Sequence, residues 1–158
     1  MFDQINGLPV HALVLHAAVI FVPLLALGAV VYAVYVPWRP KIGWAVALLA
    51  VIAPATTFVA RQSGAKLYDR LIGNGISGPA KDLLDDHMGF GTMTFWYVLV
   101  LGIVTLAMVG LTLRRPGTLP KPAEWGMAAV MVVLAALSGY YVFRTGDSGA
   151  HAVWGQNG

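Results

Sequence analysis

Four stretches of the sequence are long, apolar and free of Asp, Glu, Lys and Arg, and they constrain the fold more than any other feature. They cover residues 8–36, 42–60, 90–113 and 125–143, and each is near or above the ~20 residues that a helix needs to cross the hydrocarbon core of a bilayer. Spanning strands are about half as long, and every backbone group must be paired inside a membrane, so only helices fit. The sequence therefore predicts an all-α polytopic membrane protein, a four-transmembrane-helix up-down bundle.

The composition agrees with a single transmembrane domain over residues 1–158. The chain is 58% hydrophobic and 11% charged, and its mean hydropathy is +0.73, far from the average of soluble domains. We expect helices at about 8–36, 42–60, 88–113 and 123–144, and an extracytoplasmic loop 61–87 with short interfacial helices. The absence of cysteine from the sequence excludes disulfides, cysteine-held iron–sulfur clusters and covalent c-type haem.

Basic residues in the short connections predict the orientation. Arg39 and Lys41 join the first two stretches, and Arg114, Arg115 and Lys121 join the last two. Because Lys and Arg in short loops remain on the cytoplasmic side, both termini are expected to be extracytoplasmic. The net charge of +3 lies mostly in these loops, which favours contact with anionic lipid headgroups in the bilayer and argues against nucleic acid as a partner.

A hairpin pattern occurs twice along the chain. The first copy begins near His16 and ends at Ser63-Gly64-Ala65, and the second begins near His87 and ends at Ser148-Gly149-Ala150. Each copy turns at a basic connection. The pattern predicts a duplicated hairpin with a pseudo-two-fold axis along the membrane normal, and coincidence is the alternative. In an up-down bundle the first and third helices would then be diagonal, and His16 would face His87.

Four histidines, His11, His16, His87 and His151, fall near one membrane face in this threading. His11 and His16 are five residues apart, which on a helix is ~140° of rotation and ~7.5 Å of rise, so they cannot both face one small ion. An ionisable residue at membrane depth is a functional candidate, and His16 fits that description best. The alternative for His16 is a neutral imidazole that is hydrogen-bonded to a neighbouring helix.

The sequence leaves three functions open for these histidines, and it also allows that the protein binds no cofactor. The first is haem b held between His16 and His87, with Met88 as a further axial candidate. The second is a histidine-bound transition metal, and the third is a proton relay or pH sensor in which imidazoles titrate near Asp85, Asp86 and Asp147. The metal ligands would be chosen from His11, His16, His87, Asp147 and His151. The sequence contains no nucleophile elbow or phosphate-binding loop, so we expect no catalytic residues and no independent catalytic activity.

Three strings together carry a resemblance to a known family: Gly7-Leu8-Pro9-Val10-His11, the Ser63-Gly64-Ala65 string with His87, and the closing string 146–154, GDSGAHAVW. With them the chain resembles the bacterial four-helix membrane proteins called domain of unknown function 2231. The resemblance implies the fold and a place in the bacterial cytoplasmic membrane.

The resemblance also bears on function. Relatives joined to Rieske-type or cytochrome-type domains imply a redox role, with haem b or a metal bound at the extracytoplasmic side for electron transfer or cofactor handling. The alternative is a non-catalytic accessory or structural subunit, with a larger membrane complex or a homo-oligomer as the partner. Relatives carry Gly-His where this chain has Gly146-Asp147, and this departure argues against a site that needs a histidine there.

Overall fold

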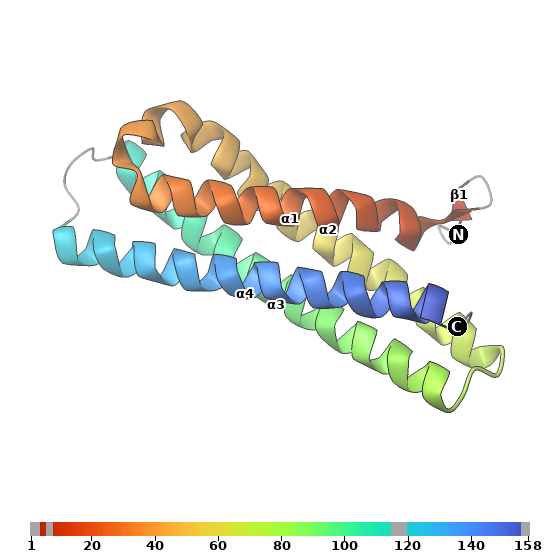
Figure 1. The fold of residues 1–158 in the computed structure, drawn as a ribbon. Coiled ribbons are helices and arrows are strands. Elements are labelled where there is room, and N and C mark those ends of the chain that lie inside the picture. Colours follow the sequence, from red (N-terminus) through yellow and green to blue (C-terminus); the bar gives the residue numbers. More distant parts are fainter. Residues whose placement is uncertain (1–3, 6–7, 115–119, 156–158) are drawn as a thin grey trace.

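Four long helices make up nearly all of the structure, a computed structural model that describes residues 4–5, 8–114 and 120–155 (Figure 1). They are α1 (Val10–Val34), α2 (Arg39–Gly73), α3 (Pro79–Arg114) and α4 (Lys121–Trp154). A short 3-10 turn, η1 (Val36–Trp38), joins α1 to α2, and two-residue strands β1 (Gln4–Ile5) and β2 (Leu8–Pro9) pair antiparallel before α1. Gly7 of the opening string and Arg115 of the last basic connection lie outside the described residues.

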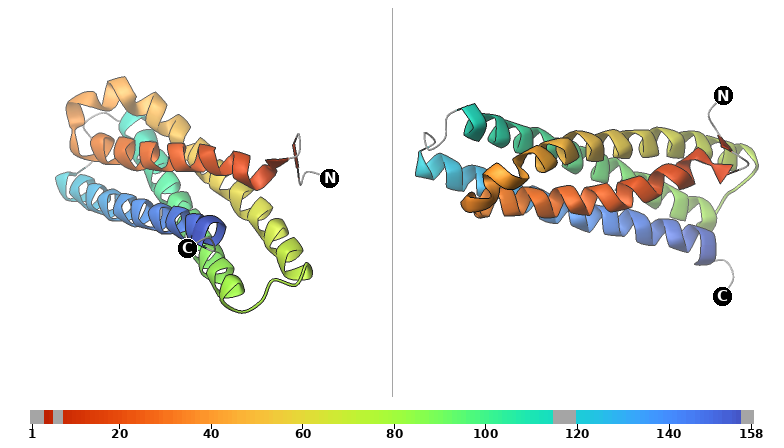
Figure 2. Two further views of the ribbon diagram at one scale, coloured as in Figure 1. Left: turned by 45° about the vertical axis from the view of Figure 1, so that its right-hand side comes forward. Right: turned by 90° about the horizontal axis from the view of Figure 1, so that it is seen from above.

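The helices form an up-down bundle in which each packs against two neighbours. α1 and α3 both pack against α2 and α4, so they stand diagonally across the core. The start of α1, the end of α4 and the α2–α3 turn lie at one end of the bundle, called the terminal end below (Figures 1 and 2). All four helices are long and apolar enough to cross a membrane. The predicted all-α, four-span bundle and the diagonal placement of its first and third helices are confirmed.

α2 and α3 are longer than the sequence led us to expect. In place of the expected loop 61–87 with short interfacial helices, α2 continues to Gly73 and α3 begins at Pro79. The apolar run marks only the part of a helix that faces lipid, and residues 61–73 contain no proline to end the helix. The turn instead depends on Gly75 and Gly78, whose φ angles are +93° and +63°, followed by a proline at the first position of α3. At 35 residues, α2 is about 52 Å long, so it projects well beyond a ~30 Å hydrocarbon core.

The same difference occurs at the end of the chain. α4 was expected at 123–144 but runs to Trp154, so the closing string and His151 belong to a helix and not to a tail.

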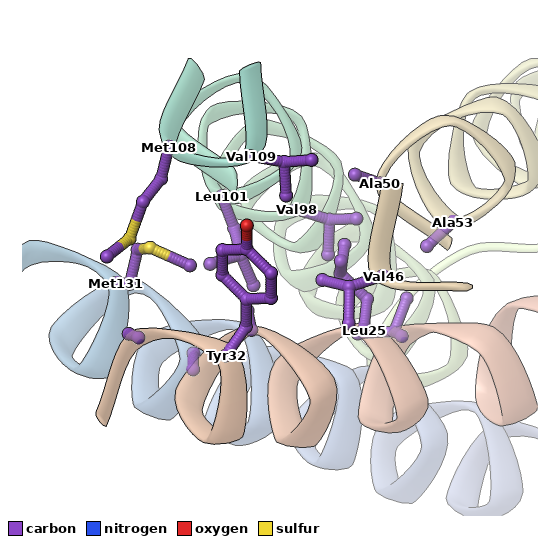
Figure 3. Close-up of a cluster of buried hydrophobic side chains, with 14 of the residues drawn as sticks. Leu25, Tyr32, Val46, Ala50, Ala53, Val98, Leu101, Met108, Val109 and Met131 are labelled. Atoms are coloured by element: carbon purple, nitrogen blue, oxygen red, sulfur yellow. The ribbon is translucent and has the colours of Figure 1, made fainter. Parts of the chain in front are cut away.

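The centre of the bundle is a core of apolar side chains from all four helices (Figure 3). Its fully buried members include Leu25, Tyr32, Leu101, Met108 and Met131. The outward faces of the helices are apolar as well, since Leu27, Leu113 and Phe143 are 64%, 68% and 69% exposed. An apolar surface of this kind needs lipid rather than water around it.

The buried positions of the first hairpin recur in the second at a constant offset. The six described buried residues of α1 each match a buried residue of α3 that lies 76 positions later, the same separation as from His11 to His87. Four buried residues of α2 each match a buried residue of α4 that lies 85 positions later, the same separation as from Ser63 to Ser148. Such regularity is what a duplicated hairpin produces, in a register that pairs His87 with His11 and not with His16. The matched pairs are Ala18/Thr94, Val22/Val98, Leu25/Leu101, Ala29/Thr105, Tyr32/Met108, Ala33/Val109, Gly43/Ala128, Val46/Met131, Ala50/Ala135 and Ala53/Ser138.

Arg39 joins three helices at the end opposite the terminal end. Its Nε donates to the carbonyl of Tyr32 at 2.9 Å, and its Nη2 donates to the carbonyl of Ala33 at 2.8 Å. These carbonyls belong to the last turn of α1, which has no helical donors of its own to satisfy them. Nη1 forms a salt bridge with Glu124 of α4. The side chain of Arg39 is only 10% exposed, so this guanidinium is a largely buried link between α1, α2 and α4.

Candidate functional site

His11 and His87 lie next to one another at the terminal end of the bundle. The centroids of their rings are 6.2 Å apart, and the ring planes are perpendicular. His11 is in the first turn of α1 and His87 is in the third turn of α3, so the two imidazoles come from different hairpins and meet across the diagonal of the bundle. Both side chains are half-buried.

His11 is held by the helix that follows it in the same hairpin. Its Nδ1 donates to the main-chain carbonyl of Ala60 on α2 at 2.9 Å and lies 3.3 Å from the hydroxyl of Ser63. That hydroxyl donates its own proton to the same carbonyl, so its oxygen is left to accept from the ring. The ring lies directly against Gly64, where a Cβ atom would be 2.9 Å from its Cε1. Glycine at this position is therefore what lets the imidazole reach the α2 backbone.

His87 repeats this arrangement with α4. Its Nδ1 donates to the carbonyl of Thr145 at 3.0 Å and lies 3.1 Å from the hydroxyl of Ser148, which donates to the same carbonyl. A Cβ atom at Gly149 would be 3.0 Å from the Cε1 of His87. The hydroxyl of Thr145 is hydrogen-bonded to the hydroxyl of Thr94 at 2.9 Å, and this bond joins α4 to α3.

These contacts determine the tautomer of both imidazoles. A carbonyl oxygen can only accept a hydrogen bond, so Nδ1 carries the proton in each ring. In the neutral ring Nε2 then has a free lone pair. This nitrogen is therefore available as an acceptor or a metal ligand.

Two arginines lie within a turn of the anchoring residues. Arg61 directly follows Ala60 on α2, and its Nε donates to the hydroxyl of Thr92 at 3.4 Å. Arg144 directly precedes Thr145 on α4, and its guanidinium lies over the ring of Phe90, 4.6 Å from the centroid. Among the described residues the Nε of Arg144 is buried without a hydrogen-bond partner. Both arginines therefore contact α3, at Thr92 and Phe90.

A family model described as "Predicted membrane protein (DUF2231)" matches residues 7–157. The chain belongs to this family. The matched range contains the four helices, both histidines and both Ser-Gly strings, so the histidine pair lies within the DUF2231 domain itself. Comparison with curated proteins and with solved structures gives no significant match.

The DUF2231 structure does not place His16 beside His87. His16 is exposed, and it lies ~7.5 Å further along α1 and ~140° around it from His11. His11, which the sequence had suggested only as a metal ligand, occupies the position opposite His87 instead. Met88 follows His87 on α3 and is half-buried.

The remaining acidic and histidine candidates lie apart from the pair or have other partners. Asp147 and His151 form an exposed pair on α4, with 3.5 Å between Oδ1 and Nδ1. Asp85 accepts from Tyr68 and pairs with Lys81 on the projecting α2–α3 hairpin. In residues 4–5, 8–114 and 120–155 no group of three or more His, Cys, Asp or Glu side chains is arranged to hold a metal ion. The structure thus brings together two of the five predicted metal ligands, His11 and His87.

Proposed function

We propose that this DUF2231 membrane protein holds a metal centre between His11 and His87, and that it serves in electron transfer or cofactor handling. The centre is a transition-metal ion or the iron of haem b. The observation that carries the proposal is that Nδ1 of His11 and Nδ1 of His87 each donate to a main-chain carbonyl of the other helix in the same hairpin. Histidines that bind metals usually donate their second nitrogen to a carbonyl or a carboxylate, which fixes the tautomer and directs Nε2 at the metal.

The position of the pair along the bundle suits exchange with the aqueous phase. From His11 to the end of α1 at Val34 the helix rises about 35 Å, slightly more than the ~30 Å of a hydrocarbon core. The pair therefore lies at the level of a membrane interface. A centre at that level can be loaded from water, and it can pass electrons to a partner at the membrane surface.

We further propose that this interface is on the extracytoplasmic side of the cytoplasmic membrane, and the distribution of basic residues supports this orientation. Arg39, Lys41, Arg114 and Lys121 all lie at the opposite end of the bundle, and such residues remain cytoplasmic. The cysteine-free chain allows a direct test with single-cysteine variants. In intact cells a membrane-impermeant maleimide should label Asn74→Cys in the α2–α3 turn and leave Lys121→Cys unlabelled. The reverse pattern would put the histidine pair on the cytoplasmic side.

Metal content tests the proposal itself. The full chain, purified in detergent, is offered copper, zinc, iron and haem in turn, and bound metal is measured after gel filtration. We expect one centre per chain, lost in His11→Ala and His87→Ala and retained in His16→Ala and His151→Ala, two histidines outside the pair. Wild-type protein that retains none of the four, or equal retention by all four variants, would overturn the proposal.

A non-catalytic structural role, as an accessory subunit, is the second candidate. It is favoured by the fact that each imidazole already ties two helices together, α1 to α2 through Ala60 and α3 to α4 through Thr145. Under this role His11→Ala and His87→Ala would lower the melting temperature of the purified chain, and no metal or haem would raise the melting temperature of the wild type.

A further inference from the structure

The geometry points to one class of ligand: the iron of a haem, with His11 and His87 as its two axial ligands on opposite faces of the macrocycle. This inference rests on the proposed function and makes it more specific. It follows from the spacing of the rings, from how they are anchored and from the arginines that adjoin the anchoring residues in the sequence.

The ring spacing separates a linear arrangement of ligands from a tetrahedral one. With a metal–nitrogen bond of ~2.0–2.1 Å, the centre of an imidazole lies roughly 3.2 Å from the metal. Two imidazoles on opposite sides of one metal then have centroids about 6.4 Å apart, whereas a tetrahedral angle brings them to about 5.2 Å. The rings of His11 and His87 are 6.2 Å apart. This separation agrees with axial ligation of one iron and is about 1 Å too long for a tetrahedral ion.

The anchoring is also what axial ligation requires. Haem iron takes four nitrogens from the porphyrin, so two imidazoles complete its coordination. Each ring is fixed independently, His11 by α2 and His87 by α4, so the perpendicular ring planes are compatible with one flat group between them. The residues that contact the rings on α2 and α4 are small, so each imidazole lies directly against the helix that anchors it. They are Ala60, Ser63, Gly64, Thr145, Ser148 and Gly149.

Arg144 supplies a second, independent observation. Burial of a guanidinium nitrogen is unfavourable unless an anion or another acceptor is hydrogen-bonded to it. The Nε of Arg144 is in this situation among the described residues, one position before the residue that anchors His87. Arg61 lies one position after the residue that anchors His11. The two carboxylates of a haem carry the charge that these arginines would pair with.

The test is the absorption spectrum of the full chain in detergent after titration with hemin. We expect a saturable Soret band at one haem per chain, with sharp α and β bands of a six-coordinate iron after reduction with dithionite. His11→Ala and His87→Ala should each weaken retention of hemin at least about tenfold, and free imidazole should restore the six-coordinate spectrum. Rescue by imidazole distinguishes a lost ligand from a misfolded chain.

Arg144→Gln tests the role of charge, with exposed Arg114→Gln at the opposite end as its control. We expect a several-fold weaker affinity for hemin in Arg144→Gln and none of this loss in the control. A bound metal ion that needs both histidines, without any Soret band after hemin titration, would refute axial haem ligation and leave the proposed function standing. Absence of both would overturn the two proposals together. A Soret band unchanged in His11→Ala and His87→Ala would also refute this inference.

Discussion

Replacing Gly64 by alanine should push the His11 imidazole away from α2. The added Cβ would lie 2.9 Å from Cε1 of the ring, too close for a stable contact, and 3.2 Å from Nδ1, so the ring must move. Overpacking of this kind costs about 1–3 kcal/mol, and loss of the bond to Ala60 is part of that cost. Alanine also favours the helix over glycine by about 1 kcal/mol. The free energy of unfolding of Gly64→Ala should therefore fall by roughly 0–2 kcal/mol.

Gly146→Ala is the matched control, because a Cβ there would have no neighbour within 4 Å. The control should gain up to about 1 kcal/mol from helix propensity alone, so the two variants should differ by about 1–3 kcal/mol. Reversible unfolding in mixed micelles, followed by circular dichroism, measures the difference. In a His11→Ala background the clash disappears, and Gly64→Ala should then resemble the control. Equal stability of the two glycine variants in the wild-type background would refute the assigned position of the ring.

Two further changes test the packing of the bundle. Gly102→Ala would place a Cβ 2.6 Å from the carbonyl oxygen of Ala50, a backbone atom that cannot move out of the way as a side chain can. We expect the free energy of unfolding to fall by about 2–3 kcal/mol relative to Gly110→Ala, whose Cβ would have no neighbour within 4 Å. A difference under about 1 kcal/mol would contradict the close α2–α3 crossing. Arg39→Ala removes the partner of Glu124 and should lower the free energy of unfolding by about 2–4 kcal/mol in the same assay. Glu124→Gln keeps an amide oxygen that accepts from Arg39, so it should cost only about 1 kcal/mol. Equal losses in the two variants would contradict the buried link between these helices.

The sequence predicted the fold well because membrane helices are specified by local composition. Four uncharged apolar runs were enough for the number of spans, the up-down order and the diagonal placement of α1 and α3. The ends of the helices were not predictable in the same way, because hydropathy falls where a helix leaves lipid and not where it ends. Residues 61–73, which include several charged side chains, were therefore predicted to be a loop, and the closing string was predicted to follow the last helix, although both segments are helical.

The site was predicted in part. His87 and the two Ser-Gly strings were identified, but the first copy of the hairpin was taken to begin near His16, so His16 was expected to face His87. The structure puts His11 opposite His87 instead, because position around the helix decides what a side chain faces. The sequence does contain the correct register: His11 and His87 are each followed by Val eleven residues later and by Leu fourteen residues later. Those residues, Val22 with Leu25 and Val98 with Leu101, are buried equivalents in the two hairpins.

Most of the matched core positions have diverged between the two hairpins, whereas the histidine pair has not, and this contrast argues for a function there. Core equivalents need only be buried, so Tyr32 matches Met108 and Ala53 matches Ser138. At the opposite end of the bundle the equivalents Arg39 and Glu124 carry opposite charges and pair with each other, since two like charges meeting there would repel. His11 and His87, with their serines and glycines, are identical in both hairpins. Packing alone would allow these positions to differ as most of the matched core residues do, whereas a centre bound equally from two sides requires the same ligand, the same tautomer and the same anchoring carbonyl in each half.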